Sequence, residues 1–197
     1  MRISVVGAVA VTAGVAMPAA ADIPTPKVDY SAQVRLAEME KPVTMRHKDG
    51  VMRMEMDMEG EPAVFLFDTR KGTGTMLLGG EDGKMAMEVG AAGGPVRLPK
   101  AGSKDGTADA RKTGTDRVAG HACNVWSYTD PATKATDTAC ITDDGILLRS
   151  TATVDGKRTT VLEAISLDRK TQAAALFTVP TDYQRVSVPA MSGMPNR

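Results

Sequence analysis

Methionine is the residue type in this sequence that is best placed to do chemistry. The chain has 13 Met but only three Phe, three Tyr and one Trp. A thioether is flexible and polarisable, so it can fill irregular space, adapt to varied apolar guests or ligate a soft ion such as Cu(I). Most of these residues alternate with polar ones, which gathers them on one face of the expected strands. They are Met45, Met52, Met54, Met56, Met58, Met76, Met85 and Met87.

Three interpretations of this face stay open: core packing, an adaptable lining for a hydrophobic ligand, and a copper site. The lining would combine methionines with two phenylalanines of the intervening segment, as Met45, Met52, Met54, Met56, Phe65, Phe67, Met76, Met85 and Met87. A copper site would add His47, which the expected register places opposite Met52. The opposite face is expected to be exposed to solvent, because it contains the charged residues Arg53, Glu55 and Asp57. This favours a buried methionine face.

Cys123 and Cys140 are the two cysteines of the chain. They lack the Cys-x-x-Cys redox spacing, so we expect a structural disulfide. A hairpin that turns at Pro131-Ala132 would set them directly opposite each other on neighbouring antiparallel strands, a position compatible with disulfide geometry.

No familiar enzyme motif is present, neither a nucleophile elbow, a zinc-protease helix, a phosphate-binding loop nor a dinucleotide fingerprint. His47 and His121 are the two histidines, and we expect both to be strand or turn residues. Asp143-Asp144-Gly145 could hold a cation but is typical of a tight turn. We therefore expect a non-enzymatic protein without a cofactor or a resident metal.

Residues 1–21 have the pattern of a secretory signal peptide. Met1-Arg2 is a basic start, residues 3–17 are apolar, and Ala19-Ala20-Ala21 supplies the small residues of a cleavage site. The apolar run is short for a membrane span, and no cysteine follows the site to carry a lipid anchor. We expect a soluble periplasmic protein in which the disulfide forms.

The composition after the cleavage site excludes several classes of partner. The whole chain has 24 basic and 24 acidic side chains, and the signal pattern contains Arg2 but no acid, which leaves a net charge of −1 on residues 22–197. Such a chain, without a basic block, is a poor candidate for binding nucleic acid or an anionic membrane surface. We expect a monomer that binds a hydrophobic small molecule or a lipidated protein segment and does not insert stably into a membrane.

Alternation of apolar and polar residues predicts strands that are joined by tight turns. Residues 28–36 form the first such run, and residues 63–68 are apolar on both faces, as in a central strand. Three Asp-Gly pairs are typical of two-residue hairpin turns. They are Asp49-Gly50, which would pair Met45 with Met54 and Val43 with Met56; Asp82-Gly83, which would pair Met87 with Leu78; and Asp155-Gly156, which would pair Ile146 with Ile165.

The remaining segments complete one β domain over residues 22–188. Residues 90–115 are rich in Gly and contain two Pro, which predicts a flexible connection. Residues 171–176 could form a helical turn capped by Thr171, and residues 183–188 a last strand. Residues 189–197 are expected to be a disordered tail.

Two blocks of the sequence resemble an exported bacterial family, the domain of unknown function 4412. The first runs from Thr113 through Gly120-His121-Ala122-Cys123 to Trp126, and the second from Ala139-Cys140 to Arg149. The ending Leu176-Phe177-Thr178-Val179-Pro180, followed by Tyr183, is similar to that group and to the periplasmic lipoprotein carriers LolA and LolB. The resemblance implies a curved antiparallel half-barrel whose concave face holds a hydrophobic ligand, and it supplies no catalytic residue.

We therefore predict a mainly β protein of about ten strands, with a curved antiparallel sheet that forms an open, LolA-like half-barrel and at most one short C-terminal helix. Its expected function is to shelter a lipid, an acyl chain or a lipoprotein segment on the methionine face. The alternatives are a periplasmic Cu(I)-binding protein that uses Met and His, and a structural domain for envelope assembly.

Overall fold

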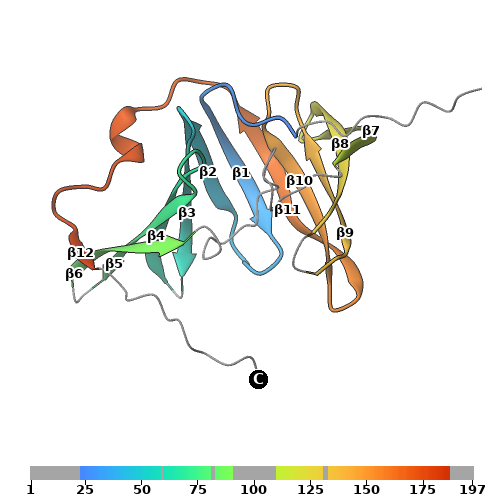
Figure 1. Ribbon diagram of the computed structural model, residues 1–197. Helices are drawn as coiled ribbons and strands as arrows, with labels where there is room; N and C mark the ends of the chain where they lie inside the picture. The colour runs from blue at the N-terminus through green and yellow to red at the C-terminus, as the bar shows by residue number, and fades with distance from the viewer. Residues whose placement is uncertain (1–22, 59, 81–82, 91–109, 131–132, 187–197) are drawn as a thin grey trace, which may run out of the picture.

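A single sheet of twelve strands organises the residues that the computed structural model describes, which are 23–58, 60–80, 83–90, 110–130 and 133–186 (Figure 1). The strand order is β12-β6-β5-β4-β3-β2-β1-β11-β10-β9-β8-β7. The strands are β1 (Tyr30–Leu36), β2 (Val43–Lys48), β3 (Val51–Met58), β4 (Glu61–Asp68), β5 (Thr73–Gly80), β6 (Gly83–Gly90), β7 (Arg111–Val118), β8 (His121–Thr129), β9 (Thr136–Ile141), β10 (Leu147–Val154), β11 (Lys157–Asp168) and β12 (Gln184–Val186).

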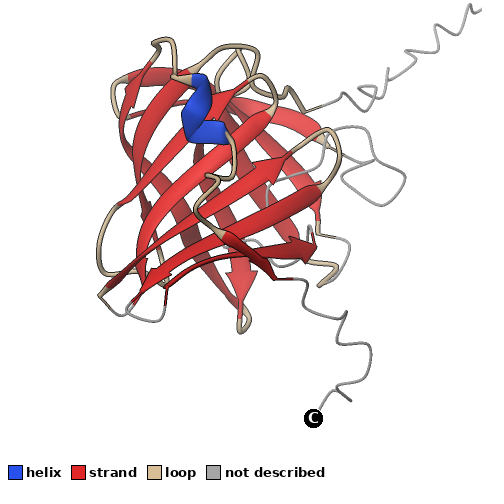
Figure 2. Cartoon of the chain, turned by 90° about the vertical axis from the view of Figure 1, so that its left-hand side faces the viewer, coloured by secondary structure: helices blue, strands red, loops and turns tan. Residues whose placement is uncertain are grey.

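The sheet is open and curved, which confirms the predicted half-barrel (Figure 2). Every strand pair is antiparallel except that of β12 with β6, which is parallel. The described part of the chain therefore has two more strands than the ten expected. The expected signal peptide and the tail of residues 189–197 lie outside the described residues. No described helix is long and apolar enough to cross a membrane.

The first predicted hairpin is confirmed in its register. Met45 pairs with Met54, as expected, about a turn in which Asp49 and Gly50 have φ of 46° and 78°. A type I′ turn requires positive φ at both central residues, which is why Asp-Gly predicts the register here. Residues 63–68 lie in β4, a central strand between β3 and β5, as predicted.

The registers predicted for the other two Asp-Gly turns are wrong in part. Leu78 pairs with Met85 rather than with Met87, because Gly80 pairs with Gly83 and the turn is centred one residue before Asp82-Gly83. Asp155-Gly156 does join β10 to β11, with Val154 opposite Lys157. A β-bulge between Ser150 and Thr151 then shifts the register, so that Ile146 and Ile165 do not pair. A bulge adds one residue to one strand and is not marked by a turn signal.

Two expected loop and helix boundaries also need correction. The predicted connection over residues 90–115 overlaps the ends of two strands, since β6 ends at Gly90 and β7 starts at Arg111; residues 91–109 lie outside the described residues. The expected helical turn is a 3-10 helix, Ala174–Phe177, whose N-cap is Ala173 and not Thr171.

The main core lies on the inner face of the sheet and joins both of its arms. Tyr30, Ala32, Val34 and Leu36 of β1 are buried, as their alternation predicts. The same cluster continues through β2–β4 on one side of β1 and through β8–β11 on the other. β1 itself pairs with β2 and with β11, so it joins the arm of β2–β6 and β12 to the arm of β7–β11.

A C-terminal strap, defined here as residues 170–186, crosses the outer face of the arm formed by β2–β6 (Figures 1 and 2). The Arg53 guanidinium donates a hydrogen bond of 2.8 Å to the Leu176 carbonyl oxygen. Tyr183, with Val179, packs on a second, smaller cluster of Leu66, Leu77 and Ala86. Beneath the strap only 15% of the Arg53 side chain is exposed, so the outer face is less exposed to solvent than the sequence predicts.

Candidate functional site

The predicted lining residues come together in cross-strand rows on the inner face of β2–β6. The central row is Met45, Met54, Phe65, Met76 and Met87, each paired with the next across the sheet. On one side of it lies the row Met56, Ala63, Leu78 and Met85; on the other lies the row His47, Met52, Phe67 and Gly74. We call these three rows the methionine face. Leu78 was not among the predicted lining residues, although its alternation with Met76 was a usable signal.

Burial divides the predicted residues into an enclosed part and an accessible part. Met45, Met52, Met54, Met56 and Phe65 are buried in the main core. The half-buried ones are Phe67, Met76 and Met87. Met85 is 39% exposed, and its neighbour at the rim, Met58, is 47% exposed. The methionine face is therefore core packing in β2 and β3, is half-buried at Phe67, Met76 and Met87, and is most exposed at the rim of β3–β6.

A hollow of about 430 Å³ opens at this rim. Met58, Ala63, Leu78 and Met85 contribute apolar side chains to its lining, which also includes the backbone of Gly79 and the charged Glu61. Ala63, Leu78 and Met85 are consecutive members of one row of the methionine face, so the hollow borders that face. An apolar molecule could reach the inner face at this place. We call it the rim hollow.

A second hollow, of about 570 Å³, adjoins the rim hollow at Pro62 and Ala63. Its lining includes four charged residues, among them Lys41 and Asp57, which form an ion pair of 2.7 Å. The hydrogen bond from Lys41, with a second from the Gly60 backbone N–H, keeps the pKa of Asp57 below its usual value. The lining of this hollow therefore combines charged side chains with apolar ones such as Met56 and Val64.

Phe65 lies over Gly74, and this close contact fixes the centre of the methionine face. A Cβ at Gly74 would lie 2.7 Å from two atoms of the Phe65 ring and 3.2 Å from Val89. We predict that Gly74→Val destabilises the protein by about 1–3 kcal/mol, because the added side chain overpacks this site. Urea unfolding will measure the change. Thr75→Val, in the same strand but on the opposite face, is the control, and an equal loss there would contradict the prediction.

His47 is opposite Met52, as predicted, but both of its ring nitrogens are used within the fold. Nδ1 lies 2.9 Å from the Val28 carbonyl oxygen, and Nε2 accepts a hydrogen bond of 3.1 Å from the Gly50 backbone N–H. Its ring stacks on Tyr30 with centroids 5.7 Å apart. A copper ligand needs a free imidazole nitrogen, so this arrangement favours a structural role for His47.

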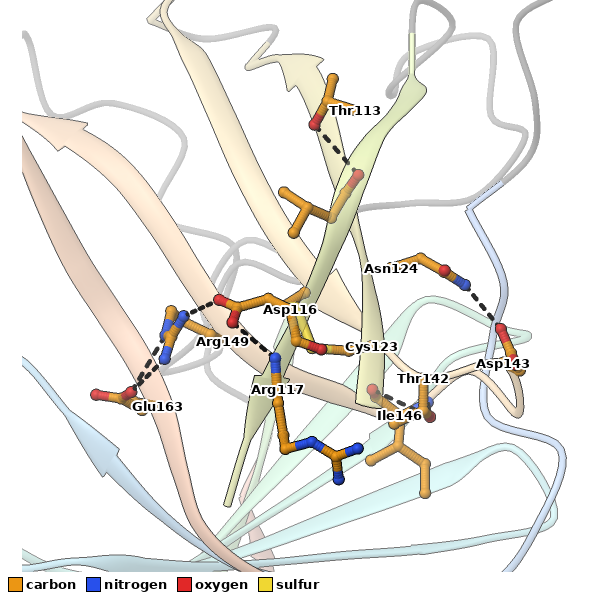
Figure 3. The surroundings of a disulfide bond; sticks show 12 residues. Thr113, Asp116, Arg117, Cys123, Asn124, Thr142, Asp143, Ile146, Arg149 and Glu163 are labelled. Carbon is orange, nitrogen blue, oxygen red and sulfur yellow. Dashed lines mark hydrogen bonds and ion pairs between the residues drawn. A yellow bond between two sulfur atoms is a disulfide. The ribbon is translucent and has the colours of Figure 1, made fainter. Parts of the chain in front are cut away.

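The predicted disulfide is confirmed and lies in the other arm of the sheet, between β8 and β9 (Figure 3). The Cα atoms of Cys123 and Cys140 are 5.4 Å apart. The two are not directly opposite, because Val125 pairs with Cys140. The last bonded pair of the hairpin is Asp130 and Ala135, so its loop is two residues longer than a turn at Pro131-Ala132 requires.

An ion-pair chain beside the disulfide joins β10 to its neighbour β11 and to β7, which is not its neighbour in the sheet (Figure 3). Arg149 of β10 binds Asp116 of β7 at 2.6 Å and Glu163 of β11 at 2.9 Å. Hydrogen bonds from the Arg117 N–H and the Arg149 guanidinium lower the pKa of Asp116. The sequence does not predict this chain, because it depends on the curvature that brings β7 near β11.

The turn at Asp143-Asp144-Gly145 is confirmed, and its carboxylates are bound by side chains. Arg169 donates hydrogen bonds of 2.6 and 3.1 Å to Asp144, which lower the pKa of that carboxyl. Asn124 donates one of 2.7 Å to Asp143 (Figure 3). The described residues contain no group of three or more His, Cys, Asp or Glu able to hold a metal ion.

The same turn holds residues 23–29, which we call the N-terminal segment. The Lys27 N–H donates a hydrogen bond of 3.0 Å to the Asp144 carbonyl oxygen. Gly145 has φ of +87°, and a Cβ there would lie only 1.9 Å from the Thr25 carbonyl oxygen. The N-terminal segment can pack on this turn only because position 145 has no side chain.

Solved structures provide a comparison for this arrangement. The chain is similar to an uncharacterised conserved protein from Thermus thermophilus, with a TM-score of 0.54, 16% identity and coverage of 82% of this chain and 91% of the other. The two share a fold. Weaker similarity is found to MucB in the Pseudomonas aeruginosa MucA/MucB complex and in a complex with MucA(peri).

For these two structures the TM-scores are 0.48 and 0.46 and the identities 15% and 18%; the match covers 82% of this chain but only 59% and 58% of the MucB chains. No family model and no curated protein matches the sequence, so membership of the domain of unknown function 4412 stays a prediction.

Proposed function

We propose that the protein is a non-enzymatic binding module that shelters a hydrophobic ligand inside its half-barrel and admits it at the rim hollow. One observation carries the proposal: an apolar inner face runs without interruption from the buried Met54 and Met56 to the exposed Met85. The ligand is a lipid, an acyl chain or the lipidated segment of another protein.

Flexible thioethers suit such a site because they re-pack around guests of different shape. Covering apolar surface contributes roughly 25 cal/mol per Å² removed from water, so a chain that covers Met58 and Met85 gains affinity even before it enters the interior. Deeper entry requires the buried methionines to change rotamer. The site therefore favours slender, flexible molecules over rigid ones.

The compartment belongs to the same proposal. The Cys123–Cys140 disulfide is compatible with an oxidising environment, and residues 1–21 have the pattern of an export signal. We propose the periplasm. An acyl-binding module there would keep a hydrophobic molecule away from water between two membranes.

The test is a charge placed at the rim. We predict that Met85→Asp weakens binding of N-phenyl-1-naphthylamine, a neutral apolar fluorophore, about tenfold, because a carboxylate in the rim hollow must be desolvated when the probe binds. Met85 is 39% exposed, so the variant is expected to fold, which a thermal melt will check. Fluorescence titration gives the dissociation constants.

Ile165→Asp is the matched control. Ile165 is 43% exposed but lies on β11, away from the rim hollow, so its substitution should leave probe affinity unchanged. Equal affinity of the wild type and Met85→Asp would place binding elsewhere. Native mass spectrometry of protein purified from its own cells adds a direct readout: a co-purifying lipid mass supports the proposal, and a copper adduct supports the metal alternative.

A further inference from the structure

Methionine is the side chain of this protein that a peroxide oxidises most readily. Both cysteines are joined in the disulfide, so the chain has no free thiol, which would be the faster target. Oxidation converts the flexible, apolar thioether of methionine to a polar sulfoxide, and exposed sulfur reacts before buried sulfur. The described residues include these methionines: Met39, Met45, Met52, Met54, Met56, Met58, Met76, Met85 and Met87.

Two of these methionines are exposed, and both line the rim hollow. Met58, at the end of β3, is 47% exposed, and Met85, near the start of β6, is 39% exposed. Their neighbours on the same face of the two strands are covered: Met54 is 4% exposed, Met56 is 9% exposed and Met87 is half-buried. The fold therefore presents two sulfur atoms to solvent at one place.

Glycines keep the approach to these two sulfur atoms open. Gly79, Gly80 and Gly83 line the rim hollow without side chains. A Cβ at Gly83 would have nothing within 4 Å, so the described part of the chain does not crowd this turn. The hollow of about 430 Å³ has room for several molecules of water, whose share of the liquid is about 30 Å³. Hydrogen peroxide, with two oxygen atoms, therefore fits beside either thioether.

A sulfoxide at this rim has no side chain to donate a hydrogen bond to it. Among the described lining residues the one polar side chain is Glu61, whose carboxylate accepts hydrogen bonds and does not donate them. The sulfoxide oxygen is also an acceptor, so water solvates it. An apolar guest that covers the rim would remove this water and leave the oxygen without a donor, which opposes binding.

We propose that Met58 and Met85 form an oxidation site that closes the rim hollow to apolar guests. In each reaction the thioether sulfur attacks one oxygen of hydrogen peroxide, so that an S–O bond forms and the O–O bond breaks. The other oxygen leaves as hydroxide and takes the proton of the new S–O–H group to give water. Sulfur loses two electrons and the peroxide gains them, and a methionine sulfoxide reductase reverses the change. The closing of the hollow rests on the proposed function, whereas the site of oxidation does not.

Peptide mapping after brief treatment with hydrogen peroxide tests the site. Met54, Met56 and Met58 lie on one tryptic peptide, and Met85 and Met87 on another, so tandem mass spectrometry compares them directly. Met58 should take up oxygen about tenfold faster than Met54, in line with their exposed fractions of 47% and 4%. Met85 should likewise react before Met87. In urea the rates should become equal, because the fold then covers none of the sulfur atoms.

Titration with N-phenyl-1-naphthylamine before and after the treatment tests the closing of the hollow. Oxidised wild-type protein should bind the probe about fivefold more weakly than untreated protein, and sulfoxide reductase should restore the affinity. The double variant Met58→Leu/Met85→Leu has no sulfur at the rim. Its affinity, whatever the starting value, should therefore be the same before and after treatment.

Met39→Leu is the matched control for the double variant. Met39 lies between β1 and β2, outside the lining of the rim hollow, so this variant should respond to peroxide as the wild type does. A thermal melt of the oxidised protein checks that weaker binding does not come from unfolding. The melting temperature should stay unchanged, because the two modified side chains are exposed.

The outcomes separate the two proposals. Equal oxidation rates of Met58 and Met54 in the folded protein would overturn the oxidation site. Selective oxidation with unchanged probe affinity would overturn the closing of the hollow and leave the proposed function standing. Failure of untreated protein to bind the probe would overturn the proposed function and the closing of the hollow with it. The order of oxidation would then still support or overturn the site.

Discussion

Gly145→Ala is expected to lower the melting temperature by about 5–15 °C. The backbone at Gly145 has φ of +87°, a conformation that costs an alanine roughly 1–2 kcal/mol. Its Cβ would also lie 1.9 Å from the Thr25 carbonyl oxygen, so the N-terminal segment has to move away. Loss of that packing raises the total loss of unfolding free energy to about 2–4 kcal/mol. Each kcal/mol lowers the melting temperature of a chain of this size by about 2–4 °C.

Gly120→Ala separates the two contributions. Gly120 has φ of +80° but nothing within 4 Å of a Cβ, so the variant has the backbone strain without the collision. It should lose about 1 kcal/mol. Trypsin cleavage after Lys27 should accelerate in Gly145→Ala alone, because the Lys27 hydrogen bond to Asp144 is broken with the contact. Equal melting temperatures of the two variants would contradict the packing role of Gly145.

Replacing Cys123 and Cys140 together with serine is expected to reduce the free energy of unfolding by about 3 kcal/mol. The disulfide closes a loop with a sequence separation of 17, and a loop of this length restricts the unfolded chain by about that amount. The bond also fixes β8 to β9 beneath the ion-pair chain of Asp116, Arg149 and Glu163. Urea unfolding with and without reductant will measure the change.

Two comparisons accompany the serine variant. Reduced wild-type protein should unfold at the same urea concentration as the variant, and oxidised wild type at a higher one. Affinity for the apolar fluorophore should stay the same, because the disulfide lies in β8 and β9 and the rim hollow in β3–β6. A midpoint that reductant does not move would contradict the stabilising role of the bond.

The sequence predicts the fold class well because local signals determine most of it. Alternation in residues 30–36 gives the buried face of β1, and Asp49-Gly50 determines the register of β2 and β3, since two positive φ values at the turn fit one hairpin geometry. The predicted strand registers are wrong where the pairing depends on more than the residues of the turn. The bulge at Ser150/Thr151 and the longer loop after Asp130 are of this kind.

The candidate site is less predictable, because exposure depends on long-range structure. Alternation places Met54 and Met85 on one face, and it cannot tell that the first is buried and the second lies at the rim. The same applies to His47, whose two nitrogens are taken by Val28 and Gly50 of the surrounding backbone. Tyr30 and Trp126 resemble ordinary core residues in the sequence, and only the structure shows that their buried donors have no partner among the described residues.

The place of β1 in the sheet has a consequence for how the chain folds. Val34, near the start of the described chain, pairs with Ala164, near its end, so the middle ladder cannot form until most of the chain has been synthesised. The strands on either side are built from hairpins that close locally and fast, whereas contacts of high sequence separation slow folding. A nascent chain therefore carries preformed hairpins whose apolar faces stay exposed until β11 has been synthesised. A chaperone that shields these faces would raise the yield of native protein.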